Sequence, residues 1–120
     1  MNETTKPSCP THIKGEAKRE WTRISHELEA SGLLATSDRT VLALYCNAWQ
    51  RWRKAEAEIE TLGEVIPAPR TKTMMGNPWL TISNKAHEQC LKLLIELGLT
   101  PKARSKMKAK EAEIEEDFNF

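Results

Sequence analysis

The chain has 120 residues, of which 39% are hydrophobic and 29% are charged. This length and composition allow one compact domain with a short tail, and they argue against a disordered chain. No apolar run reaches the roughly 20 residues that a membrane-spanning helix needs, and the N-terminus lacks the pattern of a signal peptide. We therefore expect a cytosolic protein with no membrane partner, in which Cys9, Cys46 and Cys90 are reduced thiols.

The formal net charge of +1 hides an uneven distribution. Residues 1–63 carry nine Lys or Arg and nine Asp or Glu, residues 64–110 carry nine against three, and residues 111–120 carry none against five. Such asymmetry between segments indicates interaction surfaces. We divide the chain into a flexible N-terminal segment (1–13), a helical core and oligomerisation domain (14–100, with an arm at 64–82), a basic helix (101–110) and an acidic C-terminal tail (111–120).

The first helix is expected over residues 14–31. Ala17, Trp21, Ile24 and Leu28 are spaced by four, three and four residues, which places them in one apolar stripe. Gly32 then stands where a helix commonly ends in a left-handed conformation.

A long second helix is expected from a cap at Thr36, Ser37 or Asp38 to Leu62. Its apolar residues alternate at spacings of four and three through three heptads, and further apolar residues lie on other faces of its first half. Because so short a chain supplies little cover, we expect a second copy to cover part of this helix. The predicted oligomerisation residues are Val41, Tyr45, Trp49, Trp52, Ile59 and Leu62. The alternative is that Trp49 and Trp52 complete a core within one chain.

Residues 64–82 contain three of the six prolines and predict a long loop or a short hairpin arm. A third helix is expected from a cap at Ser83 or Asn84 to Gly98. A short basic helix follows, with Thr100 as its N-cap and Pro101 at its first position. The predicted fold class is all-α: a helical hairpin with one long central helix, the arm, a third helix and a short basic helix.

Enzymatic and metal sites are not indicated. The sequence has no phosphate-binding Gly-rich loop and no hydrolase motif, and Glu56, Glu58 and Glu60 are interpreted as a solvated helix face. Cys9 with His12 and His87 with Cys90 would together supply the ligands of a zinc site, but pairs three residues apart arise easily by chance. We predict neither a metal nor another cofactor, and no catalytic residue.

The basic stretch predicts binding to nucleic acid through phosphates, with an affinity that falls steeply with salt; the alternative is that its alternating lysines only solvate a frayed helix end. Self-association would multiply these contacts. The link between the first two helices is too long for a helix-turn-helix motif, which argues against a base-reading helix there. The predicted DNA-binding residues are Arg70, Lys72, Lys102, Arg104, Lys106, Lys108 and Lys110.

The acidic tail carries Ile114, Phe118 and Phe120 among five acids. Apolar residues in such a setting favour a peptide that docks onto another protein. A simple solubility role is the alternative.

Several short features follow one another in order between about residues 10 and 106. They are Ala17-Lys18-Arg19-Glu20-Trp21, Gly32-Leu33-Leu34, Asp38, Tyr45-Cys46, Trp49, Gly63, Asn77-Pro78, Gly98-Leu99-Thr100-Pro101 and Arg104. In order and spacing, this set resembles the small terminase subunits of tailed double-stranded DNA bacteriophages.

The resemblance implies a ring-forming, non-catalytic subunit that engages viral DNA in the host cytoplasm during genome packaging. It also implies regulation of the large terminase subunit, which carries the ATPase and nuclease activities. The framework positions that match are Trp21, Asp38, Tyr45, Trp49, Pro78, Pro101 and Arg104. The alternative is a dimeric DNA-binding transcriptional regulator with two-fold symmetry and a strong sequence preference, and a third possibility is a protein–protein adaptor that does not bind DNA.

Overall fold

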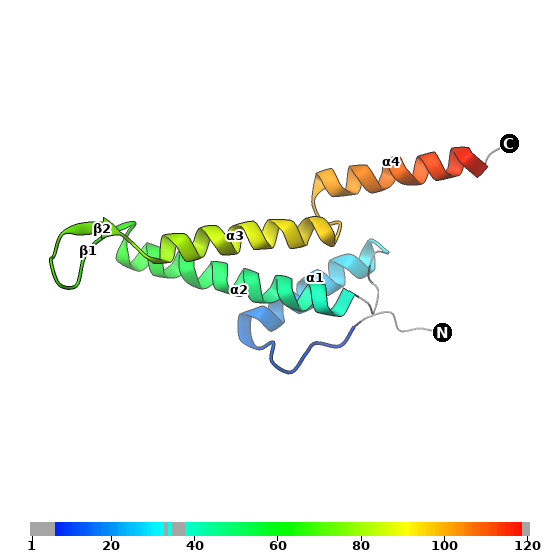
Figure 1. Cartoon of the computed structure of the whole chain (residues 1–120). Helices are drawn as coiled ribbons and strands as arrows, with labels where there is room; N and C mark the ends of the chain where they lie inside the picture. Colours follow the sequence, from blue (N-terminus) through cyan, green and yellow to red (C-terminus); the bar gives the residue numbers. More distant parts are fainter. Residues whose placement is uncertain (1–6, 33, 35–37, 119–120) are drawn as a thin grey trace.

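The computed structural model describes residues 7–32, 34 and 38–118, and it shows a mostly helical protein (Figure 1). The elements follow in the order α1 (Gly15–Ala30), α2 (Arg39–Leu62), β1 (Val65–Pro67), β2 (Met74–Gly76), α3 (Trp79–Glu96) and α4 (Pro101–Phe118). The predicted all-α class is confirmed. The suggested caps Thr36 and Ser37 and the tail residue Phe120 lie outside the described residues.

Helix α1 packs its predicted stripe into the core. Ala17, Trp21, Ile24 and Leu28 are all buried there, because their spacing keeps them on one face. Gly32 follows the helix with a φ of 73°, a left-handed conformation that glycine adopts without steric cost. The prediction for this helix is therefore confirmed to within one residue at each end.

Helix α2 and helix α3 run side by side in opposite directions and form a long hairpin (Figure 1). Small residues allow the two helices to approach closely: Ala48 and Ala55 of α2 and Ala86 of α3 are buried. Helix α2 ends where the Gly63 N–H donates to the Ile59 carbonyl over 2.7 Å. The prediction of a long helix that ends at Leu62 is confirmed.

The arm between these helices is a short antiparallel hairpin. Strands β1 and β2 pair with Val65 opposite Gly76 and Pro67 opposite Met74. The arm lies at the far end of the α2–α3 hairpin, away from α1 (Figure 1).

The start of α3 corrects the sequence-based prediction. The helix begins at Trp79 and not after a cap at Ser83 or Asn84. The Asn77 side-chain oxygen accepts a hydrogen bond from the Trp79 N–H (3.0 Å), so Asn77-Pro78 starts the helix in the way that Ser83 was expected to. Ser83 is instead buried within the helix and donates to a Glu56 carboxylate oxygen over 2.9 Å.

Helix α4 is longer than the short basic helix that we predicted. It continues through the acidic residues to Phe118, so the basic and acidic segments form two halves of one helix. Lys, Glu, Ala and Met are all good helix formers, and the change of charge sign after Lys110 does not end the helix.

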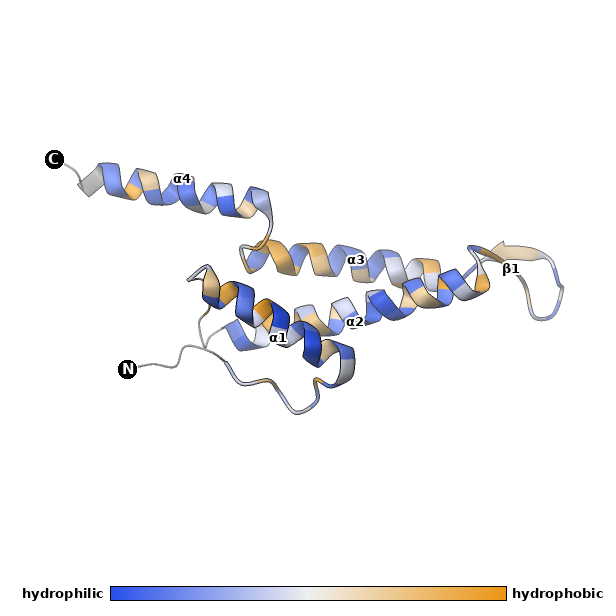
Figure 2. Cartoon of the chain, turned by 180° about the vertical axis from the view of Figure 1, so that it is seen from behind, coloured by the Kyte–Doolittle hydropathy of each residue, from blue (hydrophilic) through white to orange (hydrophobic). Residues whose placement is uncertain are grey.

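The hydrophobic core lies among α1, the first half of α2 and the end of α3. The described part of the segment that we expected to be flexible, residues 7–13, packs onto this core through Ile13 and Cys9, and the Arg39 side chain donates to the Ser8 carbonyl over 2.9 Å. Figure 2 shows hydrophobic residues along α1 and at the end of α3, whereas α4 is mostly hydrophilic. None of the described helices is long and apolar enough to cross a membrane.

The molecule is elongated, with principal dimensions of 73, 32 and 17 Å. The arm lies at one end, and α4 projects from the other (Figure 1). Any site that needs residues of both segments must therefore span the length of the protein.

Candidate nucleic-acid and assembly surfaces

The basic residues of α4 form the densest group of positive charge in the chain. Their side chains are exposed: Lys102, Arg104, Lys106, Lys108 and Lys110. Thr100 caps the helix by accepting a hydrogen bond from the Ala103 N–H over 3.1 Å, as predicted. This half of α4 can contact phosphates without any rearrangement of the core.

Arg104 differs from the lysines because it also holds the junction between α3 and α4. One of its guanidinium nitrogens donates to the Leu99 carbonyl over 2.9 Å, and the Arg104 backbone N–H donates to the Thr100 carbonyl over 3.0 Å. Arg104 therefore helps to set the direction in which α4 leaves the body.

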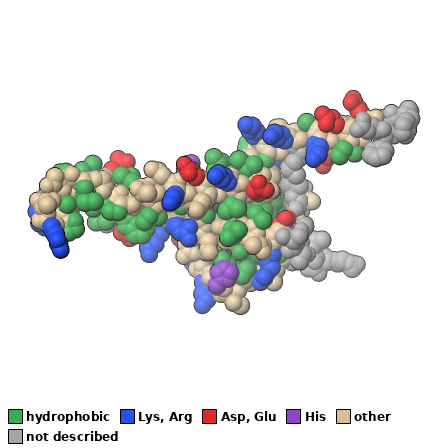
Figure 3. All heavy atoms as spheres, in the orientation of Figure 1, with side chains coloured by type: hydrophobic (Ala, Val, Ile, Leu, Met, Phe, Trp, Pro, Cys, Tyr) green, Lys and Arg blue, Asp and Glu red, His purple; other side chains and the backbone are tan. Residues whose placement is uncertain are grey.

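The other two predicted DNA-binding residues, Arg70 and Lys72, are exposed at the tip of the arm. Hydrogen bonds from the Ala68 N–H to the Thr73 carbonyl (2.8 Å) and from the Lys72 N–H to the Ala68 carbonyl (3.0 Å) close this turn. Lys72 has a φ of 61°, which is uncommon for a residue other than glycine. The structure thus separates the predicted DNA-binding residues into two groups, one at the arm and one in the first half of α4, with the length of the α2–α3 hairpin between them (Figure 3).

The predicted oligomerisation residues differ in their exposure. Tyr45 is 2% exposed and belongs to the core, and Val41 and Trp49 pack partly against that core. Trp52 and Ile59 are partly exposed, whereas Leu62 is 52% exposed. Part of the α2 stripe is therefore used within the chain, and the surface that stays available lies toward the arm.

Exposed apolar residues on α3 were missed by the sequence analysis. Leu91 and Ile95 are each 48% exposed, and Leu91 borders a groove that α2 and α3 form together. The groove is lined by Tyr45, Trp49, Trp52, His87, Cys90, Leu91 and Leu94. A signal was present in the sequence, because Leu91 directly follows Cys90 and Ile95 directly follows Leu94, so both widen the apolar arc of this helix.

A second groove lies on the other side of the α2–α3 contact. It is lined by Leu44, Asn47, Ala48, Arg51, Gln89, Lys92 and Leu93. Leu44 is 53% exposed there. The α2–α3 hairpin thus presents apolar side chains on both of its sides.

A buried carboxylate joins α1 to α2 behind these surfaces. Glu20 is 3% exposed; its carboxylate accepts hydrogen bonds from the Arg23 guanidinium (2.6 and 2.8 Å) and from the Tyr45 hydroxyl (2.5 Å). Burial and the hydrogen bond to Glu20 raise the pKa of Tyr45 above its usual range. The hydrogen bond to Glu20 raises the pKa of Arg23, which stays charged and balances the carboxylate.

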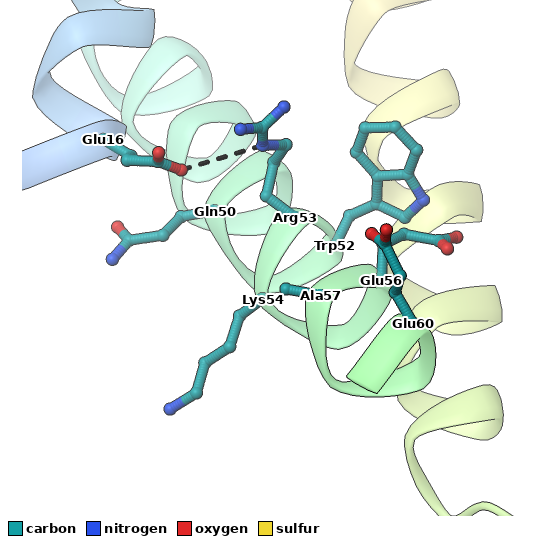
Figure 4. A pocket seen from close by; sticks show the side chains of 8 residues that line it. All are labelled: Glu16, Gln50, Trp52, Arg53, Lys54, Glu56, Ala57 and Glu60. Atoms are coloured by element: carbon teal, nitrogen blue, oxygen red, sulfur yellow. Dashed lines mark ion pairs between the residues drawn. The ribbon is translucent and has the colours of Figure 1, made fainter. Parts of the chain in front are cut away.

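An open groove beside α1 carries charges of both signs (Figure 4). Arg53 lies 3.7 Å from the Glu16 carboxylate and stacks over the Trp49 ring at 5.4 Å from its centre. Glu56 and Glu60 on the same groove are exposed, as expected for a solvated helix face, whereas Glu58 is only partly exposed. This arrangement provides charge complementarity between α1 and α2.

The two residue pairs that we considered as zinc ligands line different grooves. Cys9 and His12 border two grooves near the N-terminal segment, whereas His87 and Cys90 lie on α3. Within the described part of the chain, no group of three or more His, Cys, Asp or Glu residues is placed to hold a metal ion.

Burial also keeps two of the thiols protonated. It raises the pKa of Cys46 to about 12 and that of Cys90 to about 11. A thiol with so high a pKa carries little thiolate at neutral pH and is a poor nucleophile.

The comparison with protein families places these surfaces in context. A family model described as phage terminase, small subunit, matches residues 17–113. No curated protein and no solved structure matches the chain. The matched range contains nearly all of α1, all of α2, the arm and α3, and α4 as far as Glu113. The match covers most of the chain and confirms the resemblance seen in the sequence: this chain belongs to the phage terminase small subunit family.

Proposed function

We propose that the chain is a non-catalytic packaging subunit that self-associates, binds viral double-stranded DNA and regulates the large terminase subunit in the host cytoplasm. Its family supports a role in phage DNA packaging. The observation that carries the DNA-binding part is the basic half of α4, whose lysines are exposed and lie outside the core.

The salt dependence of DNA binding tests this part. Each phosphate contact contributes about one unit to the slope of log K against log salt concentration. We expect Lys106→Glu, Lys108→Glu and Lys110→Glu together to lower this slope by about three units per bound chain. Fluorescence anisotropy with a labelled duplex at several salt concentrations measures it.

A matched control makes the same change of charge elsewhere. Lys14, Lys18 and Lys85 are exposed and lie outside α4, so their replacement by Glu removes the same number of positive charges. This control retains most of the slope if α4 holds the DNA. Equal slopes in both triple variants would show that only net charge matters and would overturn the assignment to α4.

We propose assembly through the partly exposed apolar residues of the α2–α3 hairpin. The predicted residues Trp52, Ile59 and Leu62 supply one part of this surface, and Leu91 and Ile95 extend it on α3. Burial of exposed apolar area is the main driving force of such association, and closed symmetry makes a ring of identical contacts.

Native mass spectrometry with and without duplex DNA tests the assembly. We expect a closed oligomer, and we expect Leu91→Glu with Ile95→Glu to reduce its mass while α-helical circular dichroism is retained, because both residues are exposed. A wild-type protein that is strictly monomeric at micromolar concentration would contradict the proposal. A two-fold dimer with a strong preference for one DNA site would favour the transcriptional regulator instead.

The acidic half of α4 is the proposed contact with the large subunit. Ile114 is 48% exposed among glutamates on the helix surface, and Phe118 and Phe120 follow it in the sequence. We expect Ile114→Ser to weaken capture of the large subunit by the full chain, whereas Ala112→Ser, at another exposed position of the same helix, leaves it intact. Equal capture by both variants would contradict a contact at Ile114.

A further inference from the structure

Helix α4 carries its charges in the order that an isolated helix disfavours. The N-terminus of a helix bears a partial positive charge and the C-terminus a partial negative charge. Five Lys or Arg nevertheless occupy the first half of α4, and the acidic residues occupy the second half. The helix dipole therefore opposes both halves of the charge distribution.

Opposite charges lie three residues apart only at the middle of the helix, at Lys108 and Glu111 and at Lys110 and Glu113, and each half has no such compensation of its own. Residues four positions apart in each half, such as Arg104 and Lys108 or Glu111 and Glu115, have the same sign and repel one another. Among the side chains of α4 that the structure describes, none forms an ion pair. Helix α4 projects from the body and is covered by no other described segment (Figures 1 and 3).

The charges are arranged around one stripe of the helix. Ala103 and Ile114 are eleven residues apart, which is close to three turns, so both lie on this stripe, and Lys110 lies near its middle. One flank of the stripe carries two positive charges followed by two negative charges, at Arg104, Lys108, Glu111 and Glu115. Lys106 and Glu113 lie on the opposite flank.

We propose that α4 pairs with α4 of a second copy of this chain in antiparallel orientation. In that arrangement Arg104 faces Glu115 of the second copy, Lys108 faces its Glu111, and Lys106 faces its Glu113. Two-fold symmetry repeats each pair, and the Ile114 side chains, 48% exposed in the single chain, become covered. A parallel pair in register would instead place like charges opposite each other.

Charge complementarity favours a second α4 over the other possible partners of this helix. DNA accounts for the basic half only, because its phosphates repel the acidic half, and the proposed contact with the large subunit accounts for the acidic half only. A second α4 accounts for both halves at once. The pairing is also separate from the proposed contact through the α2–α3 hairpin, since α4 shares no residue with that surface.

The pairing has a consequence for the DNA site, and this consequence rests on the proposed function. The acidic half of the second copy covers the same lysines that are proposed to bind phosphates. Duplex DNA and the second α4 therefore compete, and the acidic half restrains DNA binding until a duplex displaces it.

Disulfide cross-linking of the full chain tests the pairing without DNA. Lys110 lies near the two-fold axis of the antiparallel pair. In the Lys110→Cys variant, the new thiol is therefore expected to form a disulfide with the same position of the second copy under mild oxidation. Lys102→Cys is the matched control, because its copy would lie roughly 22 Å away along the pair. The wild-type chain gives the background from Cys9, Cys46 and Cys90.

Charge reversal makes the test specific. In the Lys110→Cys background, one variant carries Glu111→Lys, Glu113→Lys and Glu115→Lys, and another carries Arg104→Glu, Lys106→Glu and Lys108→Glu. Each alone is expected to lose about tenfold in cross-linked dimer, because every proposed ion pair becomes a repulsion. An equimolar mixture is expected to recover the dimer.

Each outcome has a definite reading. Three results would overturn the pairing. The first is a cross-linked yield of Lys110→Cys no higher than that of the wild-type chain, and the second is an equal yield from Lys102→Cys. The third is a mixture of the two charge-reversed variants that does not recover the dimer. Added duplex is expected to lower the Lys110→Cys yield. If DNA binding depends on α4 but added duplex leaves this yield unchanged, the competition alone is overturned. If the chain does not bind DNA, the proposed function is overturned and the pairing is not affected.

Discussion

At the scale of single residues, the contact between Glu20 and Tyr45 joins the consecutive helices α1 and α2 through residues 25 positions apart. A buried carboxylate is costly unless it is hydrogen-bonded and paired with a positive charge. Arg23 supplies the charge from within α1, and the Tyr45 hydroxyl supplies the hydrogen bond from α2. This contact fixes α1 against the first half of α2.

Removal of the Tyr45 hydroxyl should therefore destabilise the fold. We expect Tyr45→Phe to lower the free energy of unfolding by about 1–3 kcal/mol, the usual range for a lost hydrogen bond to a charged group. Urea denaturation followed by circular dichroism measures this. Thr61→Val removes an exposed hydroxyl from the same helix and should change stability by less than about 0.5 kcal/mol. Equal effects of the two substitutions would show that the buried hydrogen bond contributes nothing specific.

The buried thiols make a prediction for alkaline pH. The pKa of Cys46 is raised by burial from 9.0 to about 12, so the unfolded chain releases this proton before the folded chain does. The resulting stabilisation is fully present below pH 9.0 and is lost as the pH rises toward 12. The free energy of unfolding should fall through this range, with a slope of up to about 1.4 kcal/mol per pH unit from this group.

Unfolding experiments between pH 7 and pH 11 would measure that slope. Cys46→Ala removes the titrating group and should give a flatter curve above pH 9.0 than the wild-type chain, even though the smaller side chain lowers stability at every pH. Parallel curves for the two proteins would contradict the role of Cys46.

At the scale of elements, Asn77 connects the arm to both long helices. It is buried; its side-chain amide donates to the Gly63 carbonyl at the end of α2 over 2.8 Å, and its side-chain oxygen caps α3 at Trp79. One side chain thus fixes where the arm leaves α2 and where α3 begins.

We expect Asn77→Ala to destabilise the chain by about 2 kcal/mol, because it removes the cap and leaves the Gly63 carbonyl unpaired. Asn77→Asp keeps the capping oxygen but not the amide donor, so its cost in urea denaturation should separate the two contributions. Asn84→Ala, at an exposed position within α3, serves as the control. A cost for Asn77→Ala no larger than that of Asn84→Ala would contradict this account of the arm.

The elements also show what the sequence can and cannot predict. The stripes of α1 and α2 were predictable because periodicity is a local signal. The start of α3 was misplaced because Asn77-Pro78 is equally typical of a loop and of a helix N-terminus. The full length of α4 was missed because a change in charge was interpreted as a structural boundary, although helix propensity continues across Lys110.

The candidate site was predictable to a similar extent. The basic residues of α4 and the arm were visible in the sequence as charge, but their separation depends on the α2–α3 hairpin, a tertiary feature. The contact of Tyr45 with Glu20 spans 25 residues, and no local pattern reveals it. Tyr45 was therefore assigned to an oligomer surface although it is buried within the chain.

At the scale of the whole molecule, the separation of its two basic groups, in the arm and in the first half of α4, governs how it can bind DNA. Arg70 and Lys72 lie in the arm, and the basic half of α4 lies beyond the opposite end of the α2–α3 hairpin (Figure 1), in a protein whose longest dimension is 73 Å. Ten base pairs of duplex are only about 34 Å long. A duplex of ten base pairs can therefore contact only one of the two basic groups of a chain. A duplex of about 30 base pairs, three such turns, is long enough to follow the whole molecule.

We expect Arg70→Glu with Lys72→Glu to weaken binding to the long duplex by about tenfold and to leave binding to the short duplex almost unchanged, because α4 still holds the short one. Lys106→Glu with Lys108→Glu should weaken binding to both. Since the arm and the basic half of α4 are far apart, their contributions to the binding free energy for the long duplex should be additive. Competition titrations at one salt concentration, with both duplexes and with the wild-type chain, the two double variants and their combination, measure these affinities. If the arm substitutions weaken both duplexes equally, the arm and α4 contact the same short stretch of DNA, and assembly must bring the arm of one copy beside the α4 helix of another.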